Sequence, residues 1–594
     1  SLLSVIDRCR TPMGKRNIRE WIIRPLIDRE NINRRLSIVT FFFNDVNLRR
    51  ELFTLFKNIA DIERISGRIS LGNANAKDLI ALRESLKTFP LILELLSQEK
   101  VGEVSHITDD WDSLIDMTEL IERSIVDNPP FSIREGNIIQ GSYNEELEEL
   151  YSLTKDNQTW LRNFENRLKE ENNITNLKVG YNKVYGFYIE VTKKNSHLVP
   201  ENFIRRQSLV NCERFINDEL KGYEDKILNA EERKKELEFN LFMEILSKID
   251  SNRGRLILMA KKIGYLDTLL SFAVVAEENR YVEPVIKENN ELLLEEGRHP
   301  VIEGNIEEMF VANSIELNDI DRRMAIITGP NMAGKSTYLR QTGLIVLMAQ
   351  IGSYVPAKRA EVGIVDRIFT RVGAQDNLYR GQSTFMVEMN EAANILNNAT
   401  KKSLVILDEI GRGTSTFDGL SIAWSIVEHL LTDKNLKCRT LFATHYHELT
   451  NIQALYKDVV NLLVKVEEYQ DTITFSHVVA EGKADKSYGI HVAKLAGVPK
   501  AVVNRAEIIL EEIENGNVDR YGLPKIDMRV VKKIKKNEAL QTSLFDKPKK
   551  NKYKEIIQGL KELDINSLTP LEALNQLQMI KGKIRDKEEE SPEP

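Results

Sequence analysis

Cysteine is scarce in this 594-residue sequence, and long apolar runs are missing. The only cysteines, Cys9, Cys212 and Cys438, lie far apart and form no CxxC pair. They offer no plausible disulfide framework, so we expect a reducing compartment. No apolar run reaches the roughly 18–20 residues that a membrane-spanning helix requires. These absences argue against a secreted disulfide-rich protein and against an integral membrane protein.

A surplus of positive charge is missing as well. Lys and Arg total 83 and Asp and Glu total 90, which leaves a net charge of −7. This balance excludes a globally basic nucleic-acid binder but leaves room for a local basic patch. With 42% hydrophobic and 29% charged residues, the composition is that of an ordinary soluble protein. At about 150 residues per domain, the length predicts roughly four domains.

Gly and Pro are sparse up to about residue 290, where charged and apolar residues alternate at helical spacing. The clearest helical pattern runs over 213–249, with Phe215 and Ile216 among its first apolar positions, and predicts a long charged rod with one apolar stripe. The segment 177–191 breaks this pattern, because it is rich in Val, Tyr, Phe and Ile and is punctuated by Gly. It predicts two short strands, a small β unit inserted between helices.

The pattern changes to α/β over about 290–480. Short apolar strands, predicted at 324–328, 403–409 and 440–444, alternate with helical stretches. This alternation indicates a mainly parallel sheet covered by helices. After about 515 the chain becomes polar. Between Lys525 and Lys554, eleven Lys and Arg face three Asp and Glu, which predicts a disordered basic linker.

A phosphate-binding loop is the strongest motif. Residues 329–336 read GPNMAGKS and match GxxxxGK[ST], with an apolar strand before the loop and an amphipathic helix after it. The glycines let main-chain N–H groups turn toward phosphate oxygens, and the helix N-terminus adds a positive dipole. Lys335 is expected to reach the β- and γ-phosphates, and the Ser336 hydroxyl is expected to hold Mg²⁺.

The strand LVILDE ends in Asp408 and Glu409. Behind a phosphate loop, Asp408 is expected to serve Mg²⁺ and Glu409 to polarise the attacking water as general base. Two further segments could close such a site. GQSTFMVEM presents Ser383 at a helix start that could face a γ-phosphate, although an ordinary N-capped helix explains it equally well. ATHYHEL places His445 and His447 at a strand end, where His445 is better explained as a γ-phosphate sensor than as a metal ligand.

These motifs, in this order and spacing, resemble the MutS family of DNA mismatch-repair ATPases. The resemblance is carried by TGPNMAGKSTYLRQ, STFMVEM, LDEIGRGTSTFDGLSIAW and FATHYHEL. It extends upstream through GRHPVIE and FVANSI, downstream through KSYGIHVAKLAGVPKAVVNRA, and to the first 26 residues. It covers about nine-tenths of the chain and implies a dimer with ABC-type composite ATP sites.

By this resemblance the chain is multidomain, α and α/β. A helical core/lever domain (1–159 and 216–285) carries an inserted β clamp (160–215). Next comes an ABC-type P-loop ATPase domain with a parallel-rich sheet (286–480). It is followed by a helix-turn-helix dimerisation segment (481–515) and by a basic linker with oligomerisation helices (516–594). We expect this tail to be partly disordered.

The resemblance also assigns roles within the ATP and Mg²⁺ site. Phe310 is expected to stack on adenine, Asn331 to lie near the γ-phosphate, His445 to act as switch histidine and Ser383 to be donated to the other subunit's nucleotide. The remaining phosphate-binding residues are Gly329, Pro330, Met332, Ala333, Gly334, Lys335, Ser336 and Thr337.

DNA contact is expected to be local. Basic residues cluster around the β insertion, where backbone phosphates of double-stranded, mismatched DNA could bind, although a solvated charged face would look alike. These residues are Lys183, Lys193, Lys194, Arg205 and Arg206.

The tail resembles a second kind of binding motif. Gln541, Leu544 and Phe545 form QxxLF, similar to the peptide that bacterial proteins insert into the replication sliding clamp. Further expected partners are a second copy in a dimer or tetramer and the repair protein MutL. The expected compartment is the bacterial cytoplasm, at the nucleoid.

One departure from the family matters. Its N-terminal mismatch-binding and connector domains have no counterpart, and Phe242-Met243-Glu244 has the letters of the mismatch wedge but lies in the lever pattern, where packing is expected. We therefore expect a fragment of a repair protein, without mismatch readout of its own. The alternative is a DNA-binding recombination or clamp scaffold of the same family, in which ATP is mainly a structural ligand.

Overall fold

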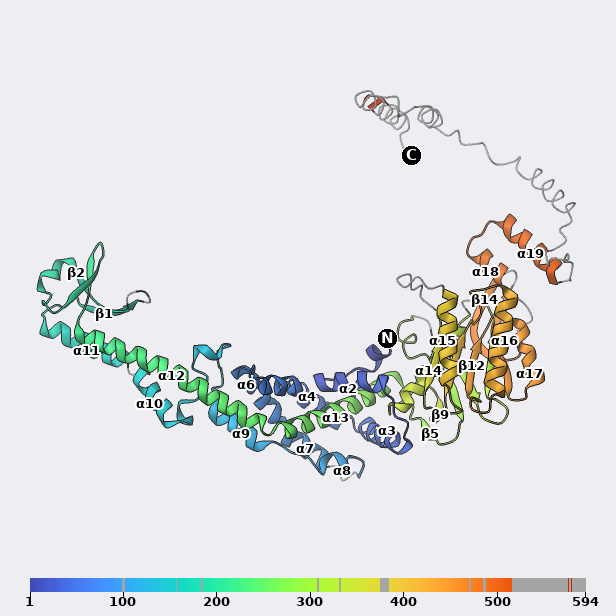
Figure 1. The fold of residues 1–594 in the computed structure, drawn as a ribbon, viewed down its shortest axis with the longest axis horizontal. Coiled ribbons are helices and arrows are strands. Elements are labelled where there is room, and N and C mark those ends of the chain that lie inside the picture. The colour runs from blue at the N-terminus through green and yellow to red at the C-terminus, as the bar shows by residue number, and fades with distance from the viewer. Residues whose placement is uncertain are drawn as a thin grey trace. The chain divides into compact units, whose positions relative to one another are not determined.

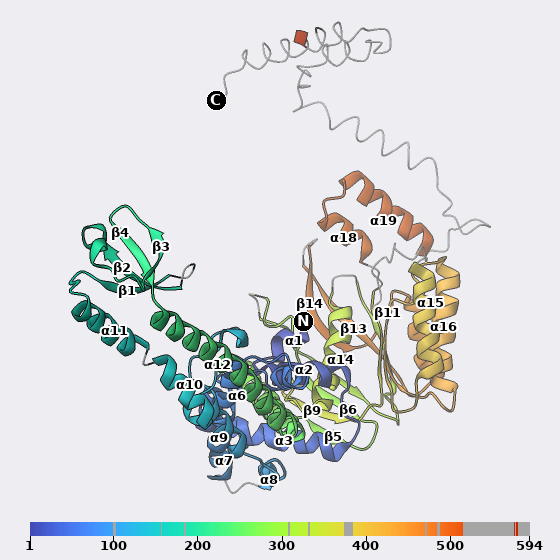
Figure 2. The same ribbon diagram turned by 60° about the vertical axis from the view of Figure 1, so that its left-hand side comes forward.

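The computed structural model describes residues 1–98, 102–155, 157–182, 184, 186–306, 309–330, 333–373, 384–469, 472–483, 488–514, 575, 578 and 579. The chain divides into two compact units, Ser1–Gly489 and Ile490–Pro594. Figures 1 and 2 show the ribbon in two views. The fold is mixed, with a helical region and an α/β region that contain several sheets.

The helical region is organised around α13 (Arg253–Asn279), which packs against α2, α3 and α5. Side chains that accept a main-chain N–H cap several of its helices at the N-terminus, among them Thr11 at α2 and Asp28 at α3. The other helices are α1 (Leu2–Ile6), α2 (Pro12–Ile23), α3 (Arg29–Asn44), α4 (Val46–Phe56), α5 (Ile62–Ser70), α6 (Ala76–Leu86), α7 (Thr88–Gln98), α8 (Gly102–Thr108), α9 (Ile115–Ser124), η1 (Ile133–Glu135) and η2 (Gly141–Tyr143).

A small β unit follows α10 (Glu145–Lys155) and α11 (Asn157–Glu171) and precedes the long helix α12 (Asp218–Asp250) (Figure 1). Its four strands pair antiparallel in the order β1-β2-β4-β3 around a separate apolar cluster that includes Phe187 and Phe215. The strands are β1 (Lys178–Asn182), β2 (Gly186–Thr192), β3 (Ile204–Ser208) and β4 (Cys212–Ile216), with η3 (Lys193–Leu198) between β2 and β3.

The helical rod expected over 213–249 begins later than predicted. Phe215 and Ile216 belong to strand β4, which the two-strand prediction missed along with β3. Asn217 separates strand from helix, because its side chain accepts the N–H of Leu220 and caps α12. Further along α12, Phe242 is fully buried in the core of the helical region, which confirms that it is a packing residue.

The α/β region contains two sheets. The smaller has the strand order β5-β9-β6-β7, and the larger has the order β10-β11-β12-β8-β13-β14, parallel from β10 to β13 and antiparallel only between β13 and β14. The strands are β5 (Val285–Lys287), β6 (Leu292–Gly297), β7 (Asn313–Leu317), β8 (Met324–Thr328), β9 (Arg359–Gly363), β10 (Ile368–Arg371), β11 (Leu404–Asp408), β12 (Arg439–Ala443), β13 (Val459–Tyr469) and β14 (Thr472–Glu481).

Helices cover both faces of the larger sheet, so β8, β11 and β12 are buried along their whole length. α14 (Lys335–Gln350) packs on the face that joins the core of the helical region. α15 (Thr384–Asn398) and α16 (Thr416–Thr432) pack on the opposite face, in a second cluster (Figure 2). η5 (His447–Asn451) and α17 (Ile452–Leu455) follow β12. Because helices cover both faces of the sheet, the sequences of β8, β11 and β12 are nearly continuous apolar runs.

The carboxyl ends of β11, β12 and β8 meet at one edge of the larger sheet. Asp408 on β11 pairs in register with Ala443 on β12, which pairs with Ile327 on β8. Loops that follow these strand ends therefore converge, and this edge is where open α/β sheets bind ligands. The phosphate loop, Glu409 and His445 all lie just beyond it.

The second unit contains α19 (Lys500–Glu514) and most of α18 (Gly489–Leu495), joined by a short turn through Gly497. These two consecutive helices lie within residues 481–515, where the sequence predicts a helix-turn-helix. Within the described residues, no helix is long and apolar enough to span a membrane.

Candidate nucleotide site

The phosphate loop connects the buried strand β8 to the start of α14. Gly329 and Gly334 have φ of +144° and +105°, and a β-carbon on Gly329 would lie 3.3 Å from the Val464 Cβ. Glycine adopts such backbone conformations without strain, which explains its presence at both positions. The first N–H groups of α14 then face the loop, as an anion site requires. Asn331 and Met332 lie outside the described residues.

Lys335 is buried in this loop, with only 4% of its surface exposed. Its ammonium donates to the main-chain oxygens of Gly329 at 2.6 Å and Pro330 at 3.0 Å. Burial lowers the pKa of Lys335 to about 8, and the negative charges of Glu409 and Asp408 oppose that shift. A buried cation whose hydrogen-bond partners in the described part of the chain are carbonyls is suited to an anionic ligand such as a phosphate group.

Asp408 ends strand β11 and is 6% exposed. Burial raises the pKa of its carboxyl group, and a hydrogen bond from the Ser336 hydroxyl opposes the rise. Its Oδ1 is buried and has no hydrogen-bond partner among the described residues. Carboxylate and hydroxyl oxygens are the ligands that Mg²⁺ prefers, so Ser336 and Asp408 fit a magnesium ion that also binds phosphate oxygens.

Glu409 has a strained backbone and two partners. Its φ of +56° is unusual for a residue other than glycine, and its N–H is held by the Ala443 carbonyl at 2.9 Å. One carboxylate oxygen pairs with His445 Nε2 and the other accepts from Arg412. The hydrogen bond to His445, with the nearby positive charges, lowers the pKa of Glu409 to about 2. Glu409 is therefore ionised and already engaged at neutral pH.

A cavity of about 600 Å³ opens beside the phosphate loop, a size that accommodates a nucleoside. The expected site residues Phe310, Ala333, Gly334 and Thr337 line it together, so the structure brings these four residues to one place. Its other lining residues are Ile302, Ile306, Met309, Val311, Asn313, Tyr338, Gln341, Val464, His477 and Val479.

His477 is a lining residue that the motifs did not predict. It has a φ of +54°, and its Nδ1 lies 2.9 Å from the Ala333 carbonyl, which ties strand β14 to the phosphate loop. Asn313 fixes this strand from the other side, donating to the His477 carbonyl at 2.9 Å and accepting the Val479 N–H at 2.7 Å. A lone histidine in a strand carries no motif, so only its place against the loop reveals it.

Of the two residues expected to close the site, the structure describes His445. His445 lies at the site through its contact with Glu409. Ser383 lies outside the described residues, immediately before α15. Among the described residues, no three His, Cys, Asp and Glu side chains gather as a metal cluster, so a cation here would also need ligand oxygens.

The basic residues expected to contact DNA lie on the β unit. Lys193 and Lys194 begin η3, and Arg205 and Arg206 lie in β3; all four are exposed. The pairing of β3 with β4 slips between Arg205 and Gln207, and this irregularity changes the direction of the side chains around Arg206. Lys183 lies outside the described residues, as do Gln541, Leu544 and Phe545 of the tail motif.

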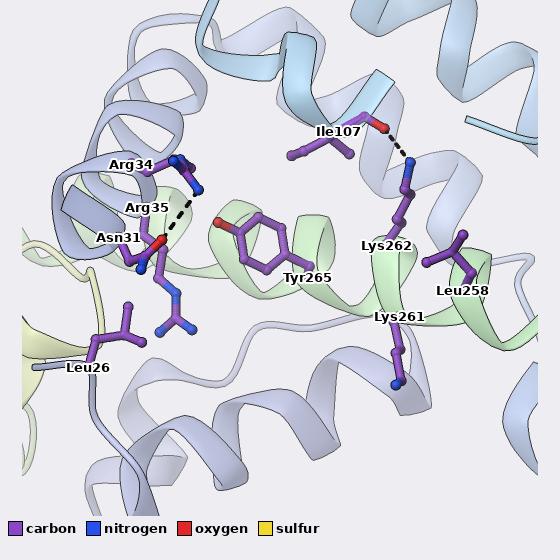
Figure 3. A pocket seen from close by; sticks show the side chains of 9 residues that line it. All are labelled: Leu26, Asn31, Arg34, Arg35, Ile107, Leu258, Lys261, Lys262 and Tyr265. Atoms are coloured by element: carbon purple, nitrogen blue, oxygen red, sulfur yellow. Dashed lines mark hydrogen bonds between the residues drawn. The ribbon is translucent and has the colours of Figure 1, made fainter. Parts of the chain in front are cut away.

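A second cavity, of about 390 Å³, lies in the helical region and has a cationic lining (Figure 3). Arg35 is buried there. It stacks on Trp21 at 3.3 Å from the ring centroid and donates to the Ile351 carbonyl at 3.1 Å. Lys262 donates to the Ile107 carbonyl at 2.9 Å. Main-chain carbonyls thus hold two of these cations in place. The lining residues are Leu26, Asn31, Arg34, Arg35, Ile107, Leu258, Lys261, Lys262 and Tyr265.

A strand, a glycine loop and a helix, with another parallel strand of the same sheet that ends in Asp408 and is followed by Glu409, are typical of phosphate-binding-loop proteins. Family models place the chain further: MutS domain III matches residues 1–273 and MutS domain V matches residues 325–514. The chain belongs to the MutS family of DNA mismatch repair proteins.

Curated relatives agree over nearly the whole chain. The DNA mismatch repair protein MutS of Alkaliphilus oremlandii is 46% identical over 592 residues, 99% of this chain and 66% of that protein. Those of Acetivibrio thermocellus and Clostridium tetani are 45% and 46% identical over 98% of this chain, and the matches cover 67% and 68% of their lengths. The chain therefore spans about two thirds of the length of these relatives.

Proposed function

We propose that this chain is the DNA-clamping ATPase part of a mismatch repair protein. ATP binding and hydrolysis at a site completed by a second copy would change the conformation in which mismatched duplex DNA is held. The observation that carries the proposal is the pair of buried, incompletely compensated charges, Lys335 and Asp408, at the carboxyl edge of the larger sheet. Such charges are stabilised by a ligand that supplies phosphate and a divalent cation together.

The residues of the nucleotide site have separate tasks in this proposal. Phe310 and His477 hold the adenine in the cavity of about 600 Å³, and residues 329–337, with Asn331 near the γ-phosphate, hold the phosphates. Ser336 and Asp408 hold Mg²⁺, which supplies charge neutralisation at the phosphate oxygens. Lys335 exchanges its carbonyl contacts for phosphate oxygens, a stronger charge-assisted pairing.

Glu409 and His445 act on the attacking water. A carboxylate whose pKa is about 2 orients and polarises water well, but it accepts a proton poorly. For Glu409 to act as general base, it must first lose a partner, either His445 or Arg412. Exchange of these contacts when nucleotide binds would raise the pKa of Glu409 toward its ordinary value. The pair is then a switch between a resting and a hydrolysing site.

A second copy of the chain completes the site in this proposal. Ser383, at the start of α15, contacts the nucleotide of the other subunit, and helices α18 and α19 belong to the segment 481–515 that braces the dimer. Residues 516–594 would extend the assembly toward a tetramer.

The β unit (160–215) is the proposed DNA clamp, on helices of the core and lever (1–159 and 216–285). Exposed Lys193, Lys194, Arg205 and Arg206 supply the cations that bind backbone phosphates without reading sequence. MutL is a further proposed partner, and QxxLF in the tail is a proposed ligand of the replication sliding clamp. The proposed compartment is the bacterial cytoplasm, which agrees with the three unpaired cysteines.

ATP turnover, measured with and without duplex DNA, tests the proposal, together with sedimentation of the purified chain with and without ATP. We expect turnover that DNA changes and a dimer in the presence of ATP. Retained ATP binding with negligible turnover would instead support the scaffold alternative, which the engaged state of Glu409 favours. A chain that stays monomeric with ATP and hydrolyses it at a rate insensitive to DNA would overturn the proposal.

A further inference from the structure

The loop that follows Glu409 is held from three sides. The Gly411 N–H donates to a carboxylate oxygen of Glu388 on α15, and the Gly411 carbonyl accepts the Tyr446 hydroxyl at 2.9 Å. A β-carbon on Gly419 of α16 would lie 2.2 Å from that carbonyl oxygen, so the two segments are in closest contact there. Both polar groups of the Gly411 peptide are thus fixed by side chains of other elements.

Glu388 is buried where a charge normally requires a partner. Only 4% of its surface is exposed, and its second carboxylate oxygen lies 3.3 Å from the guanidinium of Arg371, the last residue of β10. Removing either member of a buried ion pair leaves an uncompensated charge. Glu388 therefore binds α15 to β10 and to the loop that carries Glu409 at once.

Phe385 adds a second contact between α15 and this loop. A β-carbon on Gly413 would lie 2.9 Å from the Phe385 Cβ, so the loop packs directly on the first turn of α15. The loop cannot keep its position if α15 moves, because Gly411 and Gly413 both touch that helix. Glu409 lies two residues before Gly411, with its own backbone in the left-handed region.

We infer that Glu388 is a positioning residue that sets Glu409 according to the position of α15. The inference rests on the proposed function, in which Ser383, directly before α15, contacts the nucleotide of the other subunit. Displacement of α15 by that contact would be passed by Glu388 to Gly411 and so to Glu409. Each subunit would then adjust its own hydrolytic carboxylate to the occupancy of its partner's site.

Substitution of Glu388 separates positioning from binding. Glu388→Ala removes both contacts, and we expect turnover to fall about 100-fold, as misplacement by about 1 Å can cause, while the Kd for ATP stays within about twofold. Glu388→Gln keeps an oxygen that can accept the Gly411 N–H, so we expect it to recover much of the turnover. The measurements are kcat, the ATP Kd and the urea midpoint of each purified full chain.

Glu391→Gln is the matched control. Glu391 lies on the same helix, is half exposed, and approaches the same Arg371 at 3.1 Å, but no contact of it with Gly411 is observed. We expect its kcat to be unchanged. An equal loss in Glu391→Gln and Glu388→Ala would overturn the inference, since the Arg371 pairing alone would then explain both.

Coupling to Ser383 gives the sharper test. If Glu388 transmits the effect of Ser383, then Ser383→Ala lowers kcat in the wild-type background and has no further effect in Glu388→Ala or, should that variant fold poorly, in Tyr446→Phe. Fully additive losses would overturn the inference. Wild-type protein without any turnover would instead refute the proposed function, so the two failures are distinguishable.

Discussion

The phosphate-loop region and the four-stranded β unit differ in the burial and pairing of their charged side chains. Around the phosphate loop, Lys335 and Asp408 are buried and have no direct ion-pair partner among the residues that the structure describes, and Glu409 has a left-handed backbone. On the β unit, Arg205 is exposed and pairs with Glu213 at 3.2 Å, and Arg214 pairs with Glu190 at 3.0 Å. Buried unpaired charge is costly and indicates a ligand, whereas ion pairs that keep contact with solvent cost little and indicate much less.

The largest expected effect concerns Glu409. In Glu409→Ala we expect kcat for ATP hydrolysis to fall about 1,000-fold, because the carboxylate that acts on water is lost. ATP affinity should stay near that of the wild type, since the phosphate loop is intact. Glu448→Ala, an exposed residue three positions after His445, is the control. Wild-type turnover in Glu409→Ala would contradict the assigned role.

Lys335 should dominate nucleotide binding. We expect Lys335→Ala to weaken ATP affinity about 100-fold or more, because truncating one partner of a buried charged contact typically costs 2–5 kcal/mol. Equilibrium binding of a fluorescent ATP analogue measures it. Lys402→Ala, at the exposed start of the β11 segment, should bind normally. Tight ATP binding by Lys335→Ala would show that the buried charge serves the fold and not the ligand.

The lowered pKa of Lys335 predicts that ATP affinity depends on pH. Burial sets its pKa at about 8, so the ammonium is charged below pH 8 and is lost as pH rises above it. Phosphate binding favours the charged form, so ATP affinity should fall about fivefold between pH 8 and pH 9. In Lys335→Arg the charge persists over this range, and any remaining binding should be flat. A flat wild-type profile up to pH 9.5 would count against the burial argument.

The smallest expected effect is on the β unit. Lys193→Ala combined with Lys194→Ala should weaken DNA binding several-fold and lower the salt dependence of log K by about two units. Arg205→Ala should change that slope less, because Glu213 already neutralises part of its charge. Fluorescence anisotropy at several salt concentrations measures both. An unchanged slope in the double variant would place the DNA contact on other residues.

Prediction from sequence was accurate where one physical signal decides the structure. The runs ending at Thr328 and Asp408 are buried on both faces, and their strands lie within a residue or two of the predicted limits. The run 213–216 was misassigned to a helix, since its apolar residues fit both periods and the cap at Asn217 is decided by one side-chain contact. Strand β3, with four polar residues in IRRQS, has no apolar signal of its own.

Among the residues of the candidate site, too, sequence motifs predict some and miss others. Lys335, Ser336, Asp408 and Glu409 belong to contiguous motifs and could be predicted. His477 could not, because strand β14 reaches the loop only after the sheet has formed. Nor could the engagement of Glu409 with Arg412, or of Glu388 with Gly411, because a motif gives residue types and not which side chains pair in the folded state.

Helix α14 connects the phosphate loop mechanically to the helical region. Its 16 residues form a rod of about 24 Å, with Lys335 at one end. At the other end, Gln350 donates to the Leu26 carbonyl at 2.7 Å, and the Ile351 carbonyl just beyond accepts Arg35. Because a hydrogen-bonded helix resists compression, a small axial displacement at the phosphate loop would reach the segment joining α2 to α3 almost undiminished. A single rigid helix thus connects the phosphate loop to the helical region.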